Sequence, residues 1–310
     1  MSALVTIDLP ALIALRAEAH GFSFLPRQPV GSLLAGRHGS RLRGRGLAFE
    51  ELRRYAPGDD VRSIDWRATA RLRSPQVRVY SEERERPVLL VVDQRRPMFF
   101  GSRRAMKSVA AAEIAALGAW RALAAGDRVG GIVFNEAGII DIQPHRSQNR
   151  VLHLLHEVVR LNRALATPEP PDGAVTLNAA LESALRRATH DHLVVLVSDL
   201  DGADRQTQRL VTSLAAHNDV LVVAVYDPLG ASLQAHPGMV ATDRGAHYAL
   251  PAGSAFATAF RQSFAARLDQ WAEIFRALRV PVIPLSAASV PIDQLRELFG
   301  AHPMVGGAGR

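Results

Sequence analysis

The chain has no cysteine among its 310 residues. It therefore forms no disulfide and has no thiolate nucleophile, and we expect it in a reducing compartment, the cytoplasm. Aromatic residues make up only 6% of the chain, which leaves few side chains for stacking on nucleic-acid bases. No uncharged apolar run approaches the ~18 residues that span a bilayer, and Met1–Pro10 lacks the basic and apolar parts of a signal peptide. We expect no membrane span.

Several catalytic motifs are also missing. No GxGxxG follows the first apolar run, and neither GxSxG nor HExxH occurs. Lys107 and Ser108 follow Met106 where a phosphate-binding loop needs glycine. An aspartyl phosphatase of the haloacid dehalogenase type needs a second aspartate two positions after Asp93, and Arg95 stands there. These absences favour a protein that is not an enzyme.

Arginine is concentrated in one part of the chain. The formal net charge is +7, and Arg37–Arg86 holds 13 arginines against 8 acidic residues. Such a segment can bind nucleic acid or an acidic surface. The alternative is a solvated face with internal ion pairs, which the interspersed acids favour. A nucleic-acid binder would work through Arg37, Arg41, Arg43 and Arg45.

Hydrophobic residues make up 48% and charged residues 22%, as in soluble globular proteins. After Pro87 continuous apolar runs alternate with helical periodicity. Strands are predicted at 88–92, 193–197 and 220–226, a hairpin at 129–134 and 138–142, and helices at 105–124, 148–161, 177–188 and 205–216. This alternation predicts an α/β fold with a mostly parallel sheet flanked by helices. The C-terminal extension adds a strand pair within 239–250, helices at 254–278 and 291–299, and a strand at 280–283.

The first 86 residues have a different character. Asp8 and Pro10 predict a capped helix ending near His20, followed by an irregular arm over 21–46. A short helical piece from Leu47, a turn over 57–60 and a strand over 76–80 complete the segment. We expect three parts: 1–86 packed on the core, the α/β domain at 87–300 and a flexible tail at 301–310.

Three aspartates follow apolar runs: Asp93, Asp199 and Asp227. Ligands bind at the carboxyl ends of parallel strands, and gathered carboxylates suit magnesium. The alternative is that each aspartate caps a turn or a helix.

The segments RGRGLAFEELRRYAPGDDVRSIDWRATAR and SPQVRVYSEERERPVLLVVD, which extend from Arg43 to Asp93, resemble the domain of unknown function 58 family. The resemblance extends from about residue 30 to residue 300. It implies a Rossmann-like domain of the von Willebrand factor A type, in which many members hold magnesium at a metal-ion-dependent adhesion site.

That site is an Asp-x-Ser-x-Ser loop, a threonine and a later aspartate. Asp93, Thr176 and Asp199 match three of these positions, whereas Arg95 and Pro97 replace the two serines. The replacement removes two hydroxyl ligands and adds a cation. We therefore predict a degenerate site with no cofactor, in which the Arg95 guanidinium lies near Asp93 and Asp199. The alternative is a weakly held magnesium ion on Asp93, Thr176 and Asp199.

The signature segment itself permits two interpretations. It can lock the arm to the domain, with the aspartates paired to Arg53, Arg54 and Arg62 and with Trp66 anchored on the core, or it can form a docking surface. The segment comprises Tyr55, Pro57, Gly58, Asp59, Asp60, Arg62, Asp65 and Trp66.

The resemblance also implies a partner, because members of the family are commonly associated with MoxR-type AAA+ ATPases. We therefore expect an adaptor or co-chaperone that contacts such an ATPase, a client protein or both. The binding edge would comprise Asp93, Arg95, Thr176 and Asp199. A nucleic-acid binder is the first alternative, although we do not expect that partner. A magnesium-dependent hydrolase is the last, because ligands and an obvious general base are missing.

Overall fold

The structure is a computed structural model, and it divides into two compact units. One unit combines residues 1–35 with 86–310, and the other is 36–85. The structure describes residues 4–22, 24, 47–56, 59–82, 86–167, 173–229, 233, 238–243, 246–251, 253–277 and 280–299. Arg37, Arg41, Arg43, Arg45, Pro57 and Gly58 lie outside these residues, as do most of the predicted arm and the predicted tail.

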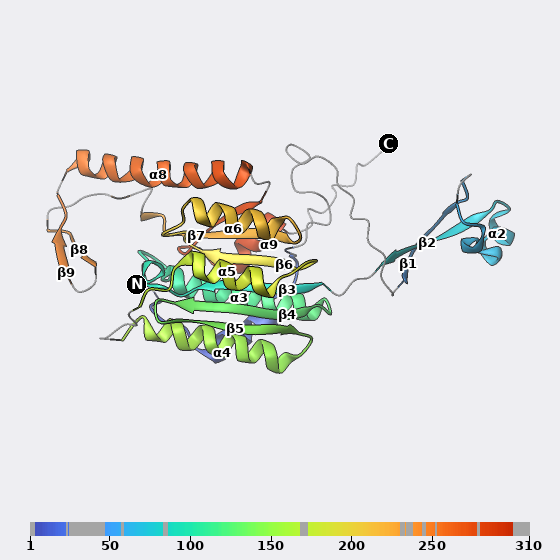
Figure 1. The fold of residues 1–310 in the computed structure, drawn as a ribbon, viewed down its shortest axis with the longest axis horizontal. Coiled ribbons are helices and arrows are strands. Elements are labelled where there is room, and N and C mark those ends of the chain that lie inside the picture. The colour runs from blue at the N-terminus through green and yellow to red at the C-terminus, as the bar shows by residue number, and fades with distance from the viewer. Residues whose placement is uncertain are drawn as a thin grey trace, which may run out of the picture. The chain divides into compact units, whose positions relative to one another are not determined.

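A six-stranded sheet forms the centre of the larger unit (Figure 1). Its strands are β3 (Pro87–Asp93), β4 (Arg128–Asn135), β5 (Gly138–His145), β6 (Leu193–Ser198), β7 (Asp219–Tyr226) and β10 (Val282–Ser286). The spatial order is β10-β7-β6-β3-β4-β5, and all neighbours are parallel except β4 and β5. This mostly parallel sheet confirms the predicted α/β class and is typical of Rossmann-like folds.

Helices cover both faces of this sheet (Figure 1). One face carries α3 (Lys107–Ala124), α4 (Gln148–Ala164) and α9 (Pro291–Phe299), and the other carries α5 (Leu177–Arg187) and α6 (Arg205–Ala215). Leu90 of β3 is buried on the α3 side, and its neighbours Leu89 and Val91 are buried on the α5 side. Because both faces are covered, β3 is apolar throughout rather than alternating.

The N-terminal segment packs on this unit. Helix α1 (Leu9–Ala14) continues into η1 (Leu15–Ala17), and the Asp8 side chain caps α1 by accepting from the Ala11 amide at 2.9 Å. Leu12 is fully buried, and the Trp120 indole donates to the Leu12 carbonyl at 3.0 Å. The α/β unit is therefore discontinuous in sequence, with residues 36–85 inserted into it.

The smaller unit contains β1 (Leu47–Arg54), η2 (Val61–Ser63), α2 (Trp66–Leu72) and β2 (Gln76–Glu82). The predicted strand over 76–80 is confirmed. The helical piece predicted from Leu47 is wrong, because β1 pairs antiparallel with β2, with Leu47 opposite Glu82 and Arg54 opposite Gln76. Backbone pairing with a partner distant in sequence outweighs a local helix preference.

The C-terminal elements follow the predicted order. Strands β8 (Val240–Asp243) and β9 (Ala246–Ala249) pair antiparallel, and α8 spans Ser254–Ala277. In the ranges that the structure describes, no helix combines the length and the apolar character needed to cross a membrane.

Candidate functional site at the carboxyl edge of the sheet

The candidate site lies where the strand order reverses direction. Strands β3 and β6 are neighbours, but β3 leads towards β4 on one side whereas β6 leads towards β7 on the other. Ligands of open α/β sheets bind in the crevice outside such a switch point. Asp93 ends β3, and Ser198 ends β6 with Asp199 directly after it.

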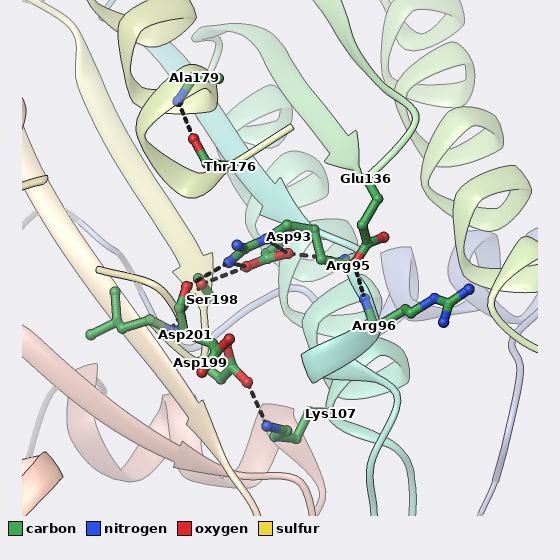
Figure 2. Close-up of polar contacts among 11 residues, drawn as sticks. Asp93, Arg95, Arg96, Lys107, Glu136, Thr176, Ala179, Ser198, Asp199 and Asp201 are labelled. Carbon is green, nitrogen blue, oxygen red and sulfur yellow. Dashed lines mark hydrogen bonds and ion pairs between the residues drawn. The ribbon is translucent and has the colours of Figure 1, made fainter. Parts of the chain in front are cut away.

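Asp93 and Arg95 form a buried ion pair at this edge (Figure 2). Arg95 Nε donates to Asp93 Oδ1 at 3.0 Å and Nη2 donates to Oδ2 at 2.6 Å, which gives a bidentate pair. The Arg95 backbone amide donates to Oδ1 at 3.0 Å, and the Ser198 hydroxyl donates to Oδ2 at 2.7 Å. Asp93 is fully buried and Arg95 is 7% exposed. The guanidinium also lies 5.4 Å from the centre of the Phe134 ring.

Burial and pairing act in opposite directions on this pair. Burial raises the pKa of Asp93, against the hydrogen bonds and charge of Arg95. Burial acts to lower the pKa of Arg95, but the hydrogen bonds and charge of Asp93 outweigh it and the pKa is raised. Three of the four hydrogen bonds to the Asp93 carboxyl come from Arg95, which has donors only, and these contacts favour the ionised carboxylate. We therefore describe the pair as ionised, with the carboxylate saturated by four donors.

The loop after β6 is fixed to the same pair. Arg95 Nη2 donates to the Asp201 carbonyl at 3.0 Å, and the Leu200 amide donates to the Ser198 hydroxyl at 3.0 Å. Leu200 has a φ of 60°, a left-handed conformation that is costly for a side chain of this size. The hydrogen bonds on either side of Leu200 hold this conformation in place.

Asp199 has a different partner from the one predicted. Its Oδ2 pairs with Lys107 Nζ at 2.5 Å, whereas Arg95 donates to Asp93 (Figure 2). Asp199 still raises the pKa of Arg95 through its charge, after the larger effects of burial and Asp93. Lys107 is the first residue of α3, where the helix dipole disfavours a cation, and Asp199 compensates it. The sequence signal for the pairing of Lys107 is its position in the first turn of the helix that follows β3.

The two other predicted site residues serve local structure. The Thr176 hydroxyl accepts from the Ala179 amide at 3.3 Å and caps α5, and it makes no hydrogen bond to Asp93 or Asp199 among the described residues. Pro97 lies in η3 (Arg96–Met98), the short turn after Arg95. The structure therefore joins Asp93 with Arg95 and places Asp199 beside them, but it keeps Thr176 apart.

Glu136 is a further carboxylate at this edge that the sequence analysis did not single out. It follows β4, and its Oε1 accepts from the Arg96 amide at 2.6 Å. Its backbone carbonyl accepts from the Val175 amide at 3.2 Å, which ties the segment before α5 to the β4–β5 turn. A polar residue directly after a central strand is the signal that could have identified it.

Asp227 follows the capping alternative. Its carboxylate accepts from the Ser102 amide at 2.8 Å, the Ser102 hydroxyl at 2.6 Å and the Leu229 amide at 2.8 Å. These contacts fix the loop between η3 and α3 to the end of β7. Asp227 therefore acts as a structural acceptor.

A buried series of hydrogen-bonded amide side chains lies next to the carboxyl edge of the sheet. Gln94 Nε2 donates to the Ser108 carbonyl, Asn162 Nδ2 donates to Gln94 Oε1, and the Ile7 amide donates to Asn162 Oδ1, each at 3.0 Å. Gln94 and Asn162 are fully buried. Gln94 lies between Asp93 and Arg95 in sequence. This series of hydrogen-bonded amides therefore connects the N-terminal segment with the ion pair.

The donor set does not fit a divalent cation. Both oxygens of Asp93 are already hydrogen-bonded by Arg95 and Ser198, and a cation there would face the guanidinium. At an effective dielectric of ~20, unit charges ~4 Å apart repel by about 4 kcal/mol, and a divalent ion roughly doubles this. Among the described residues no group of three or more histidine, aspartate or glutamate side chains could hold a metal ion.

In the signature segment one of the expected ion pairs is present. Arg53 and Asp59 form a bidentate pair with distances of 2.8 and 2.6 Å, and Arg53 holds the pKa of Asp59 below its usual value. Asp60 instead accepts from the Arg62 amide, and Asp65 caps α2 by accepting from the amides two and three residues after it. Trp66, predicted as an anchor, is 68% exposed. Tyr55 is half-buried.

Fold and site together define a Rossmann-like α/β protein whose switch point is closed by an internal aspartate–arginine pair. The chain belongs to the family described as "Protein of unknown function DUF58", whose model matches residues 51–270. The match includes the signature segment and most of the sheet.

Two mycobacterial proteins are similar to this chain over about two thirds of its length. "Uncharacterized protein Mb1516" of Mycobacterium bovis and "Uncharacterized protein Rv1480" of Mycobacterium tuberculosis are each 32% identical to this chain over 203 residues. The matched region covers 65% of this chain and 62% of each relative. The chain thus spans less than two thirds of the length of these relatives.

Proposed function

We propose that this protein is a non-enzymatic protein-interaction module of the von Willebrand factor A type, acting in the cytoplasm as an adaptor or co-chaperone for a MoxR-type AAA+ ATPase. The assignment to this type rests on the resemblance, in which Asp93, Thr176 and Asp199 match positions of a metal-ion-dependent adhesion site. The ATPase would supply the nucleotide chemistry, because this sequence lacks the phosphate-binding motifs.

The buried pair of Asp93 and Arg95 is the observation that carries the proposal. The Arg95 guanidinium binds the carboxylate that the resemblance matches to a metal ligand. Recognition at this edge would then depend on arginine and carboxylate contacts and not on magnesium. Asp93 and Asp199 are each held by a cation, so neither is available as a general base. This supports an interaction role over hydrolysis.

Calorimetric titration with magnesium tests the degenerate site. We expect no magnesium-dependent heat from the wild-type protein and no change in its melting temperature after treatment with a chelator. A micromolar dissociation constant that Asp93→Ala abolishes would contradict this part of the proposal. Arg186→Ala, at an exposed position in the last turn of α5, is the control.

Copurification with the cognate MoxR-type ATPase, with and without ATP, tests the partner. Arg103 lies exposed on the loop between η3 and α3, so Arg103→Glu reverses a charge at the binding edge without disturbing the core. We expect Arg103→Glu to weaken capture of the ATPase. Arg186→Glu is the matched control, because α5 ends near the opposite edge of the sheet. Failure of the wild type to capture the ATPase, or equal loss in both variants, would refute the partnership.

A further inference from the structure

A second surface lies on helix α2 in the smaller unit. Thr69 faces β2, because its hydroxyl accepts from the Gln76 amide at 2.9 Å. Residues four apart are neighbours on a helix surface, which places Trp66 beside Ala70 and Arg67 beside Arg71. This α2 face consists of Trp66, Arg67, Ala70 and Arg71, all of them exposed. Trp66 is 68% exposed, an unusual position for a large aromatic side chain.

The three aspartates of this unit are already occupied. Asp59 pairs with Arg53, Asp60 caps η2 and Asp65 caps α2. Arg67 and Arg71 form no ion pair with the acidic side chains that the structure describes in this unit. Like charges four residues apart also destabilise a helix. Among the side chains that the structure describes, the α2 face therefore has two arginines without an acidic partner beside an exposed indole.

We propose that the α2 face docks an acidic segment of a protein partner. Arg67 and Arg71 pair with carboxylates of that segment, and Trp66 enters an apolar cleft beside them. Arginine guanidinium groups match carboxylates in bidentate geometry. Tryptophan and arginine are the side chains most enriched among residues that dominate binding energy at protein interfaces. The charge of the face selects an acidic occupant, and the indole selects one with an apolar contact.

The same features disfavour two other occupants. Proteins that bind single-stranded nucleic acid stack successive bases on several aromatic side chains, whereas Trp66 is the one exposed aromatic among the side chains described in this unit. A helix that lies in a membrane interface separates an apolar face from a charged face. Helix α2 has only seven residues, and its exposed Trp66 is followed directly by the exposed Arg67.

Fluorescence anisotropy with the full chain tests the proposal. One probe is a short labelled peptide of glutamates with a central pair of leucines, and the other is an all-glutamate peptide of equal length. We expect Trp66→Ala to weaken binding of the leucine-containing peptide about tenfold and to leave the all-glutamate peptide unchanged. Arg67→Glu combined with Arg71→Glu should abolish binding of both peptides. The melting temperature of each variant checks that it is folded.

The matched control reverses another pair of exposed arginines four residues apart. These are Arg205 and Arg209 on α6, and their reversal to glutamate should leave the affinity unchanged. Three results overturn the proposal: no binding of the leucine-containing peptide, equal loss in the control, or tighter binding of oligo-thymidine or anionic vesicles at the same ionic strength. Arg103→Glu should not affect this assay, so its outcome is separate from that of the sheet edge.

Discussion

The most consequential single residue is Arg95, because it is charged, buried and bound to the carboxylate at the switch point. Its guanidinium satisfies both oxygens of Asp93 and the carbonyl of Asp201. Removal of one member of a buried ion pair leaves an uncompensated charge in a medium of low dielectric constant. Arg95 therefore has a structural role whatever binds at the edge.

Arg95→Ala should lower the free energy of unfolding by about 3–5 kcal/mol. Urea unfolding followed by circular dichroism measures this change. Arg186→Ala, an exposed arginine without an ion pair in the described structure, should stay within about 0.5 kcal/mol of wild type. The double variant Asp93→Asn with Arg95→Ala should be more stable than the sum of the single changes predicts, because it removes the unpaired charge. Strict additivity would argue against the pair.

At the scale of elements, side chains of one helix fix the positions of others. Asn162 of α4 reaches both the Ile7 amide in the N-terminal segment and Gln94 after β3. Asp204 caps the N-terminus of α6 in a reciprocal capping box. The Thr207 backbone amide donates to the Asp204 carboxylate at 2.9 Å, and the Asp204 backbone amide donates to the Thr207 hydroxyl. Such contacts determine where a helix begins and how it sits on the sheet.

Asn162→Leu should destabilise the protein, because the Ile7 backbone amide and the Gln94 side-chain oxygen Oε1 lose their buried partner. An unsatisfied buried polar group costs about 1–3 kcal/mol. Hydrogen exchange at the Ile7 amide should become faster, and urea unfolding should shift to lower concentration. Asn149→Leu, at an exposed position of the same helix, should change neither measurement. Unchanged protection of Ile7 would show that Asn162 does not hold the N-terminal segment.

The cap of α6 should produce a dependence on pH. Hydrogen bonds from the Thr207 amide and the Asn178 side chain lower the pKa of Asp204 below 3.8. A lowered pKa in the folded state stabilises the protein above the unfolded pKa, and this stability is lost as pH falls through the folded value. Asp204→Asn keeps a capping side chain but does not titrate. Its melting temperature should therefore decline less steeply below pH 3.8 than that of wild type, and parallel curves would contradict this.

At the scale of the whole molecule, the α/β unit is assembled from two separate stretches of chain. Residues 1–35 belong with 86–310, although 50 residues of another compact unit intervene. The buried Leu12 and the hydrogen bond from Trp120 to its carbonyl show how α1 completes the core beside α3. The N-terminal segment thus contributes to the stability of the larger unit.

Leu12→Ala should destabilise the α/β unit as a core substitution does, by about 2–5 kcal/mol. Ile13→Ala is the matched control, because Ile13 is 39% exposed on the same short helix, and it should cost less than about 1 kcal/mol. Thermal unfolding of the full chain distinguishes them. Equal small effects would mean that the N-terminal helix contributes little to the unit.

The sequence by itself determined the elements whose signals are local. The apolar runs at Val88–Val92 and Leu193–Val197 predict buried parallel strands, because burial on both faces requires apolar side chains throughout. Asp8 with Pro10 predicts the start of α1, because capping needs only neighbouring residues. The replacement of serines by Arg95 and Pro97 also pointed to a cation beside Asp93.

Only the tertiary structure decided what depends on distant partners. The segment from Leu47 becomes a strand because it pairs with β2. Ser198 donates a hydrogen bond to Asp93, which lies 105 residues earlier in the sequence. Lys107 pairs with Asp199, which lies 92 residues later. No local pattern encodes such a contact, because parallel strands that neighbour each other in the sheet are joined through long crossovers. Residue types thus set the chemistry available at the edge, and the order of the strands decided which groups meet there.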